Sequence, residues 1–214
     1  MESERSKADS GLGVDPVQLR RELRRGAAWT VALVVVLIGV YYLILEPYMD
    51  PISERASRQT ETSYQNRALE IAFTLPDGWE FAGEDQLEMM SQQLLANADG
   101  ADGRQLMIAH KPGSMLNVHI QCLSGYKSQD LDGEHLKELV DQSQYIIPEV
   151  TVREWMDPIR LGKLTYEPLY IRHEMLGMDI DQYGLIAGHR DYVVMIFLTG
   201  EVSEHPETLL DAFS

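Results

Sequence analysis

Tyr192–Leu198, with the sequence YVVMIFL, is apolar at the positions that would face either side of a strand. A strand with two apolar faces is buried on both sides by other layers of the protein. This stretch therefore predicts the central strand of a sheet, and the elements before it are arranged around it.

Two strands that precede it form an antiparallel meander with it. Leu164–His173 and Met178–Ala187 are separated by Gly177, and Gly188-His189 separates the second of them from Tyr192–Thr199. Tight turns rich in glycine join neighbouring antiparallel strands. We therefore expect these three strands to lie side by side.

A hairpin and two single strands precede the meander. Leu106–His110 and Leu116–Cys122 flank a Pro-Gly turn, and apolar and polar residues alternate in the second of these strands. This alternation predicts that Cys122 faces the core and is inert. Ala68–Leu75 also alternates with period two, and Val150–Trp155 reads as a further strand.

Helical periodicity marks three segments. Glu84–Asn97 places its apolar residues on one stripe, Leu131–Tyr145 does the same, and Glu204–Phe213 begins a closing helix. Together with the strands, these segments predict an α+β domain in which an antiparallel sheet is flanked by helices.

The order of these elements resembles a known family. Ile71–Trp79, IAFTLPDGW, is similar to the apolar strand and Pro-x-Gly-Trp turn that open PsbP/Mog1-like domains, including the DcrB-type envelope proteins. The last strand and the ending Ala212-Phe213-Ser214 are similar to the family's closing strand and helix. The resemblance covers residues 68–214. It implies an α/β/α sandwich and a binding, adaptor or assembly role, and it supplies no catalytic residues.

An uncharged segment, residues 27–45, lies ahead of this domain. A helix of that length rises about 28 Å, close to the ~30 Å hydrocarbon core of a bilayer. Trp29 lies near one end and Tyr41 near the other, where interfacial aromatic residues are enriched. A cleaved signal peptide has a shorter apolar run and a small-residue cleavage site, and a core helix is rarely apolar all round. We therefore predict an uncleaved signal anchor with one transmembrane helix.

Flanking charges set the orientation of this helix. Four arginines lie on its N-terminal side within residues 20–25, and Glu46 follows it. Because Lys and Arg favour the cytoplasmic side, the N-terminus is expected inside. This predicts a cytoplasmic tail with a short basic helix (residues 1–26), a linker (46–66) and an extracytoplasmic domain (67–214). The domain has no Asn-x-Ser/Thr sequon, which fits a bacterial cytoplasmic (inner) membrane.

The excess of acidic residues belongs to the part after the span. The chain has 18 basic and 34 acidic residues, and six of each lie within residues 1–46, which leaves 12 basic and 28 acidic residues beyond it. Nucleic-acid phosphates repel such a domain, which excludes nucleic-acid binding. Cations and basic partner proteins remain open. Cys122 is the single cysteine, so no internal disulfide forms.

Histidines near strand ends offer a candidate metal site. His173 and His189 lie near the ends of adjacent predicted strands and could approach each other together with Asp179. Imidazole and carboxylate groups suit zinc or a similar ion. Exposed polar strand ends explain the same residues without a metal.

Two functions are consistent with these observations. The first is a membrane-anchored, non-enzymatic adaptor-type domain without a cofactor, which binds another envelope protein or complex and contacts the lipid bilayer through residues 27–45. The second is a membrane-anchored metal-binding or hydrolytic domain that uses His173, Asp179 and His189.

Overall fold

The computed structural model describes residues 33–97, 102–128, 131–142 and 150–214. The chain divides into two units, Met1–Leu45 and Glu46–Ser214.

The described part of the first unit is helical. Residues 33–40 form α-helix, and Tyr41–Leu45 forms one π-helical turn, η1. Its large apolar side chains, from Leu33 to Leu45, are exposed. Among the described residues, no helix is both long and apolar enough to cross a bilayer. Residues 1–32, with the predicted tail and the first part of the predicted span 27–45, lie outside the described residues, so the anchor stays a prediction.

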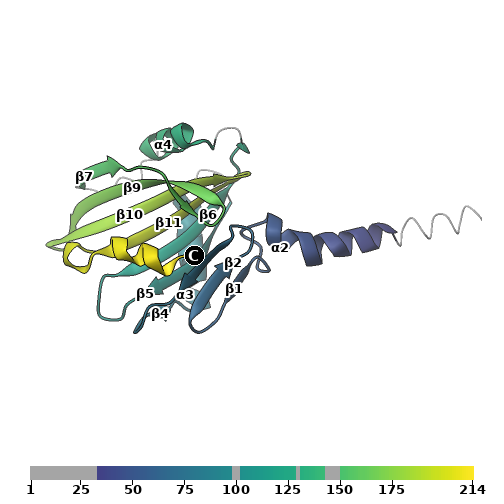
Figure 1. Ribbon diagram of the computed structural model, residues 1–214, viewed down its shortest axis with the longest axis horizontal. Coiled ribbons are helices and arrows are strands. Elements are labelled where there is room, and N and C mark those ends of the chain that lie inside the picture. The colour runs from purple at the N-terminus through teal and green to yellow at the C-terminus, as the bar shows by residue number, and fades with distance from the viewer. Residues whose placement is uncertain (1–32, 98–101, 129–130, 143–149) are drawn as a thin grey trace, which may run out of the picture. The chain divides into compact units, whose positions relative to one another are not determined.

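An eight-stranded antiparallel sheet organises the second unit (Figure 1). Its strand order is β4-β5-β6-β11-β10-β9-β7, and β8 pairs with β9 off this path. The strands are β4 (Glu80–Phe81), β5 (Gly103–His110), β6 (Asn117–Ser124), β7 (Val150–Trp155), β8 (Ile159–Leu161), β9 (Leu164–Met175), β10 (Met178–His189) and β11 (Tyr192–Glu201). The central position of β11 and the meander β9-β10-β11 are confirmed.

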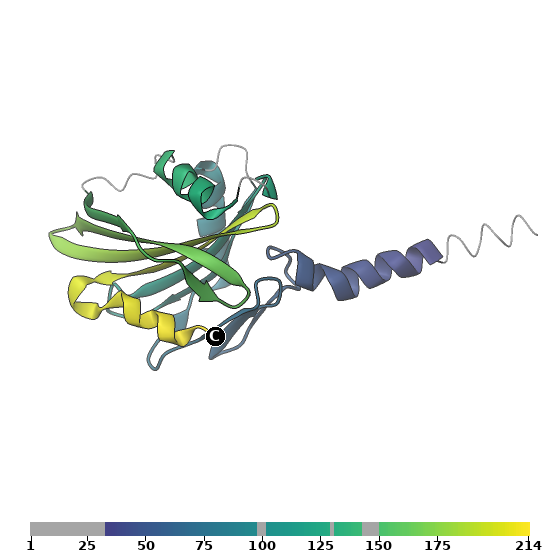
Figure 2. The same ribbon diagram turned by 45° about the horizontal axis from the view of Figure 1, so that its top comes forward.

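Helices α3 (Glu84–Asn97) and α4 (Gly133–Gln142) cover one face of this sheet. Leu94 of α3 and Leu136 of α4 belong to one buried cluster, which includes Val193 of β11. Figure 2 shows α4 lying over the sheet on the side opposite the C-terminal segment. Both helices were predicted, and the bounds of α3 match the predicted ones. Residues 143–149, which hold the predicted end of the second helix, lie outside the described residues.

A second, smaller sheet covers the opposite face. Its order is β1 (Ser57–Gln59), β2 (Ser63–Asn66) and β3 (Ile71–Thr74). Phe73 of β3 packs in the larger core cluster with Ile196 of β11.

The chain ends beside the small sheet. The 3₁₀ segment η4 (Pro206–Ala212) precedes Phe213, whose ring centroid lies 5.0 Å from that of Phe73. The Ala72 and Ser214 backbones exchange hydrogen bonds of 2.9 and 3.0 Å. The predicted α/β/α sandwich is therefore wrong for this face, where a sheet and a 3₁₀ segment replace a layer of α-helices.

The predicted linker 46–66 is part of the folded domain. Tyr64 and Asn66 of β2 are each 1% exposed. The Asn66 side chain donates from Nδ2 to the Pro51 carbonyl oxygen (2.9 Å) and accepts from the Leu69 amide (3.0 Å). The prediction of a linker failed because polar side chains make the buried contacts of this segment, and a search for apolar periodicity does not detect them.

We expect Asn66→Ala to lower the free energy of unfolding of the full chain by about 2–3 kcal/mol, since it leaves two buried backbone groups without their partner. Urea denaturation measures the change. The matched control is Gln65→Ala, at an exposed position of the same strand. Equal, small effects of the two substitutions would show that residues 46–66 do not pack on the domain.

Candidate functional site

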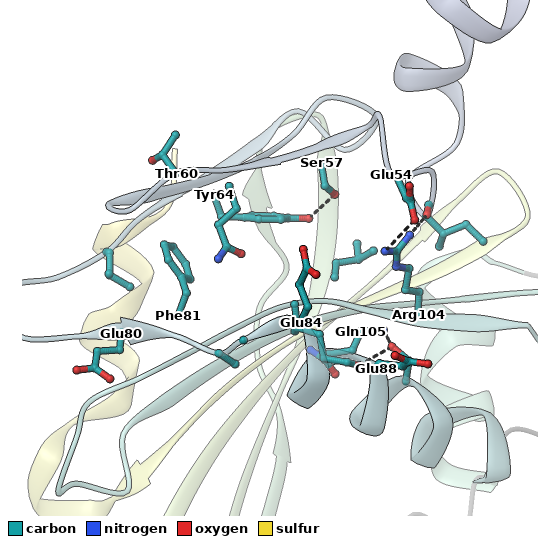
Figure 3. A pocket seen from close by; sticks show the side chains of 18 of the residues that line it. Glu54, Ser57, Thr60, Tyr64, Glu80, Phe81, Glu84, Glu88, Arg104 and Gln105 are labelled. Atoms are coloured by element: carbon teal, nitrogen blue, oxygen red, sulfur yellow. Dashed lines mark hydrogen bonds and ion pairs between the residues drawn. The ribbon is translucent and has the colours of Figure 1, made fainter.

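A groove of about 1540 Å³ opens where the two sheets diverge at one edge (Figure 3). The hairpin of β1 and β2 forms one wall, and β4, α3 and the start of β5 form the other. Small-molecule pockets usually measure about 300–1,000 Å³. The size and openness of this groove are better suited to a segment of polypeptide.

Glutamates dominate the charge of the groove. Five of them line it, against Arg104 as the one cation among the described lining residues: Glu54, Glu61, Glu80, Glu84 and Glu88. Arg104 is already engaged, because its guanidinium lies 3.9 Å from the Glu54 carboxylate and donates to the Ile52 carbonyl oxygen at 3.1 Å. Because one arginine does not neutralise five carboxylates, the groove has a negative electrostatic potential.

The floor of the groove is apolar and aromatic. Trp79 and Leu106 are buried, Phe81 and Leu87 are partly buried, and Tyr64 reaches the floor from the hairpin. Burial raises the pKa of Tyr64 to about 12, although its hydrogen bond with Ser57 (2.9 Å) acts in the opposite direction. A tyrosine with this pKa stays neutral at physiological pH and serves as a hydrogen-bonding group rather than as a base.

Local sequence explains how the wall containing α3 is placed. Gly78 has a φ of 77°, which lets the chain turn tightly after Pro76 and enter β4. The helix then begins with Glu84 and Asp85 in its first turn, where carboxylates stabilise the positive end of the helix dipole. Ser91 Oγ accepts from the Gln105 amide at 2.9 Å and holds α3 against β5.

The side chain of Gln105 stabilises the start of β5 through hydrogen bonds to the backbone. It is buried, and its Nε2 donates to the carbonyl oxygens of Met107 (2.8 Å) and Ile120 (2.9 Å) at a bulge in the β5–β6 pairing. Its Oε1 is buried and accepts no hydrogen bond from the described residues.

The free edge of β1 borders the groove. Thr60 N donates to Ser63 O and Arg67 N donates to Ala56 O, which places Arg58 in the hydrogen-bonded pair with Gln65. Because these bonds alternate along an antiparallel strand, the amide and carbonyl groups of Ser57 and Gln59 point away from β2. No described strand pairs with that side of β1.

The three predicted metal-site residues are not brought together. His173 pairs with Ile180 and Asp179 pairs with Glu174, so these two side chains point to opposite faces of the sheet. His189 lies at the other end of β10, about 30 Å away at ~3.3 Å per residue. The prediction that the strand ends would meet was wrong, because His173 lies near the β9–β10 turn and His189 lies next to the β10–β11 turn, at the opposite end of β10. No group of three or more His, Cys, Asp or Glu in the described residues could hold a metal ion.

Other reactive side chains are engaged or buried. Cys122 is fully buried, as predicted, and burial raises the pKa of its thiol. Asp181 receives two hydrogen bonds from Arg172 (2.7 and 3.0 Å) and one from Tyr170 (2.8 Å). Burial acts to raise the pKa of Asp181, but these hydrogen bonds outweigh it and the pKa is lowered. The Arg172–Asp181 pair therefore stabilises the β9–β10 hairpin and is not an open site.

Sequence reasoning did not identify the groove. One signal was present, since Glu84 and Glu88 are four residues apart and therefore share a face of a helix that was correctly predicted. The other wall comes from the segment that was read as a linker, so the two walls could not be related to each other before the fold was known.

No protein-family model matches the chain, and no curated protein does either. Several solved structures are similar to it. A protein of Bacteroides thetaiotaomicron has 9% identity and a TM-score of 0.41 over 73% of this chain, which spans about half (48%) of that protein. The PsbP protein CyanoP of Synechocystis sp. PCC 6803 has 14% identity and a TM-score of 0.39, over 77% of this chain and 98% of CyanoP. LpqN of Mycobacterium tuberculosis, involved in cell envelope biogenesis, has 16% identity and a TM-score of 0.37, over 66% of this chain and 76% of LpqN. TM-scores this low support no argument about function, and membership of the PsbP/Mog1-like family stays a prediction.

The surroundings of His189 give a pH-dependent prediction. Burial, followed by the nearby charges of Lys163 and Arg190, lowers the pKa of His189 to about 4. The unfolded chain binds a proton there below about pH 6.5. Between pH 6.5 and 4 the unfolded state therefore binds more protons, and the free energy of unfolding falls as the pH falls.

With allowance for solvent screening at this half-buried position, we expect the free energy of unfolding to fall by about 1 kcal/mol between pH 6.5 and pH 4. His189→Gln should remove this part of the pH dependence, measured by urea denaturation at several pH values. His205→Gln, at an exposed histidine, is the control. An unchanged pH dependence in His189→Gln would contradict the assignment.

Proposed function

We propose that this chain is a single-pass, membrane-anchored protein whose extracytoplasmic domain binds another protein of the bacterial cell envelope, in a non-enzymatic adaptor or assembly role. The observation that carries the proposal is the groove between the β1–β2 hairpin and α3, where glutamates surround an apolar floor. An apolar floor with charged walls is typical of a surface that recognises a protein segment.

The chemistry of the groove favours binding over catalysis. Neither histidine nor cysteine is among its described lining residues, and Tyr64 is held neutral. A nucleophilic or acid–base mechanism needs an activated group with a partner in hydrogen-bond reach. The glutamates of the groove supply charge for recognition, and their side chains are largely exposed to solvent.

Sequence and exposure together support the anchor. Residues 27–45 are uncharged, and the described apolar side chains from Leu33 to Leu45 are exposed. A contiguous exposed apolar surface of this kind needs a cover, which a bilayer provides. The arginines within residues 20–25 favour a cytoplasmic N-terminus, which places the acidic domain on the other side.

The proposed topology is tested by labelling single introduced cysteines in intact cells with a thiol reagent that cannot cross the inner membrane. Arg58→Cys, at an exposed position of β1, should be labelled, whereas Arg5→Cys should react only after the membrane is permeabilised. The native Cys122 gives little background because it is fully buried. Labelling of position 5 together with protection of position 58 would reverse the topology and refute the location.

The proposed binding surface is tested by site-specific photocrosslinking in native membranes. A photoreactive amino acid at Glu61 or Leu95, one on each wall of the groove, should crosslink the same neighbouring protein. Matched probes at Glu138 of α4 and Glu154 of β7, both exposed and outside the groove, should not crosslink it. The same adduct from all four positions, or from the two outer positions alone, would place the partner elsewhere.

A further inference from the structure

We propose that the occupant of the groove is an extended segment of the partner protein that adds to the free edge of β1 and places lysine or arginine side chains among the groove glutamates. This inference rests on the proposed function and specifies the chemistry and the binding mode of the partner. It follows from the charge of the groove, its shape and the unpaired edge that borders it.

Four glutamates of the groove have no cationic partner among the described residues. Glu61, Glu80, Glu84 and Glu88 line the groove, and none of them forms an ion pair with the described residues. Figure 3 shows the Glu84 carboxylate directed from α3 toward the β1–β2 hairpin. Like charges held along one groove repel each other, and a cationic ligand relieves this repulsion while it gains attraction.

The shape of the groove favours an extended ligand over a compact one. The groove, at about 1540 Å³, is larger than the usual range of small-molecule pockets of about 300–1,000 Å³. Its two walls run from the hairpin tip near Glu61 to the ion pair of Glu54 and Arg104. An extended chain fills such a space with few residues, and its apolar side chains reach the floor at Trp79 and Phe81.

The outward-facing edge of β1 offers backbone groups that can hold such a chain. The outward amide and carbonyl groups of Ser57 and Gln59 are the pattern to which another strand pairs. Alternate side chains of an added strand point to the same face, so residues i, i+2 and i+4 of the ligand enter the groove together. We therefore infer a ligand in which basic and apolar residues occupy these alternate positions.

The test uses the full chain and a fluorescent synthetic peptide with the sequence Lys-Thr-Phe-Thr-Lys-Thr-Val, whose alternate residues are basic and apolar on one face. Binding is followed by fluorescence anisotropy. The double substitution Glu84→Gln/Glu88→Gln should weaken binding about tenfold, as expected for two partly exposed ion pairs. The matched control is Glu134→Gln/Glu138→Gln, which changes two exposed glutamates with the same spacing at the start of α4. Binding by the control should change less than twofold. Thermal unfolding of both variants verifies that each remains folded.

Two modified peptides test the binding mode. A peptide with glutamate in place of lysine should not bind. Methylation of alternate backbone nitrogens, on the side that would face β1, should weaken binding about tenfold or more, because it removes the donors of the added strand. Equal binding by the methylated peptide would overturn pairing with β1, and equal losses in the two glutamate variants would overturn the groove as its location.

Divalent cations are tested alone by equilibrium dialysis with Ca²⁺ and Mg²⁺. Stoichiometric metal binding that Glu84→Gln/Glu88→Gln abolishes would overturn the peptide assignment, and absence of such binding supports it. If crosslinks from Glu61 and Leu95 identify a partner but the basic peptide does not bind, this inference fails while the proposed function stands. If the peptide binds the groove but no partner is crosslinked, the proposed function fails separately.

Discussion

The fold depends on keeping both faces of β11 out of water. Val194, Ile196 and Leu198 point into one core cluster, and Val193 points into the other. Burying one large apolar side chain contributes about 1.5–3 kcal/mol, so a strand with two apolar faces requires a layer on each side. Helices α3 and α4 provide one layer, and the small sheet with the C-terminal segment provides the other (Figure 1).

The groove exists because the small sheet is narrower than the large sheet that it covers. Three short strands face an eight-stranded sheet, and β1 and β4 leave a space between them at one edge. The pairing of Ala72 with Ser214 beside β3 involves the opposite edge of the small sheet. The open edge therefore combines an apolar floor, in which Phe81 and Leu87 are only partly buried, with exposed glutamates.

Strong local patterns made much of the fold predictable. The apolar run of β11 indicated its central position, the stripe of α3 gave the bounds of that helix, and the alternation in β6 correctly placed Cys122 in the core. Strand β3 lies within the predicted strand Ala68–Leu75. Strands β1 and β2 were missed because buried polar groups with hydrogen bonds, such as the Asn66 side chain, have no apolar period. The site was missed for a related reason, since its walls come from segments whose contact is set by tertiary packing. The proposed approach of His173 and His189 failed because the β9–β10 turn and the β10–β11 turn lie at opposite ends of β10.

Amide hydrogen exchange in the full chain tests most directly whether the small sheet covers the core while leaving a free edge at the groove. The account predicts slow exchange for β11, protection of the Arg58 amide that pairs with β2, and fast exchange for the Ser57 and Gln59 amides on either side of it. Equal protection of all three amides would show that the edge of β1 is already covered. Fast exchange at Arg58 as well would show that β1 does not pair with β2, and the groove would then lack one of its walls.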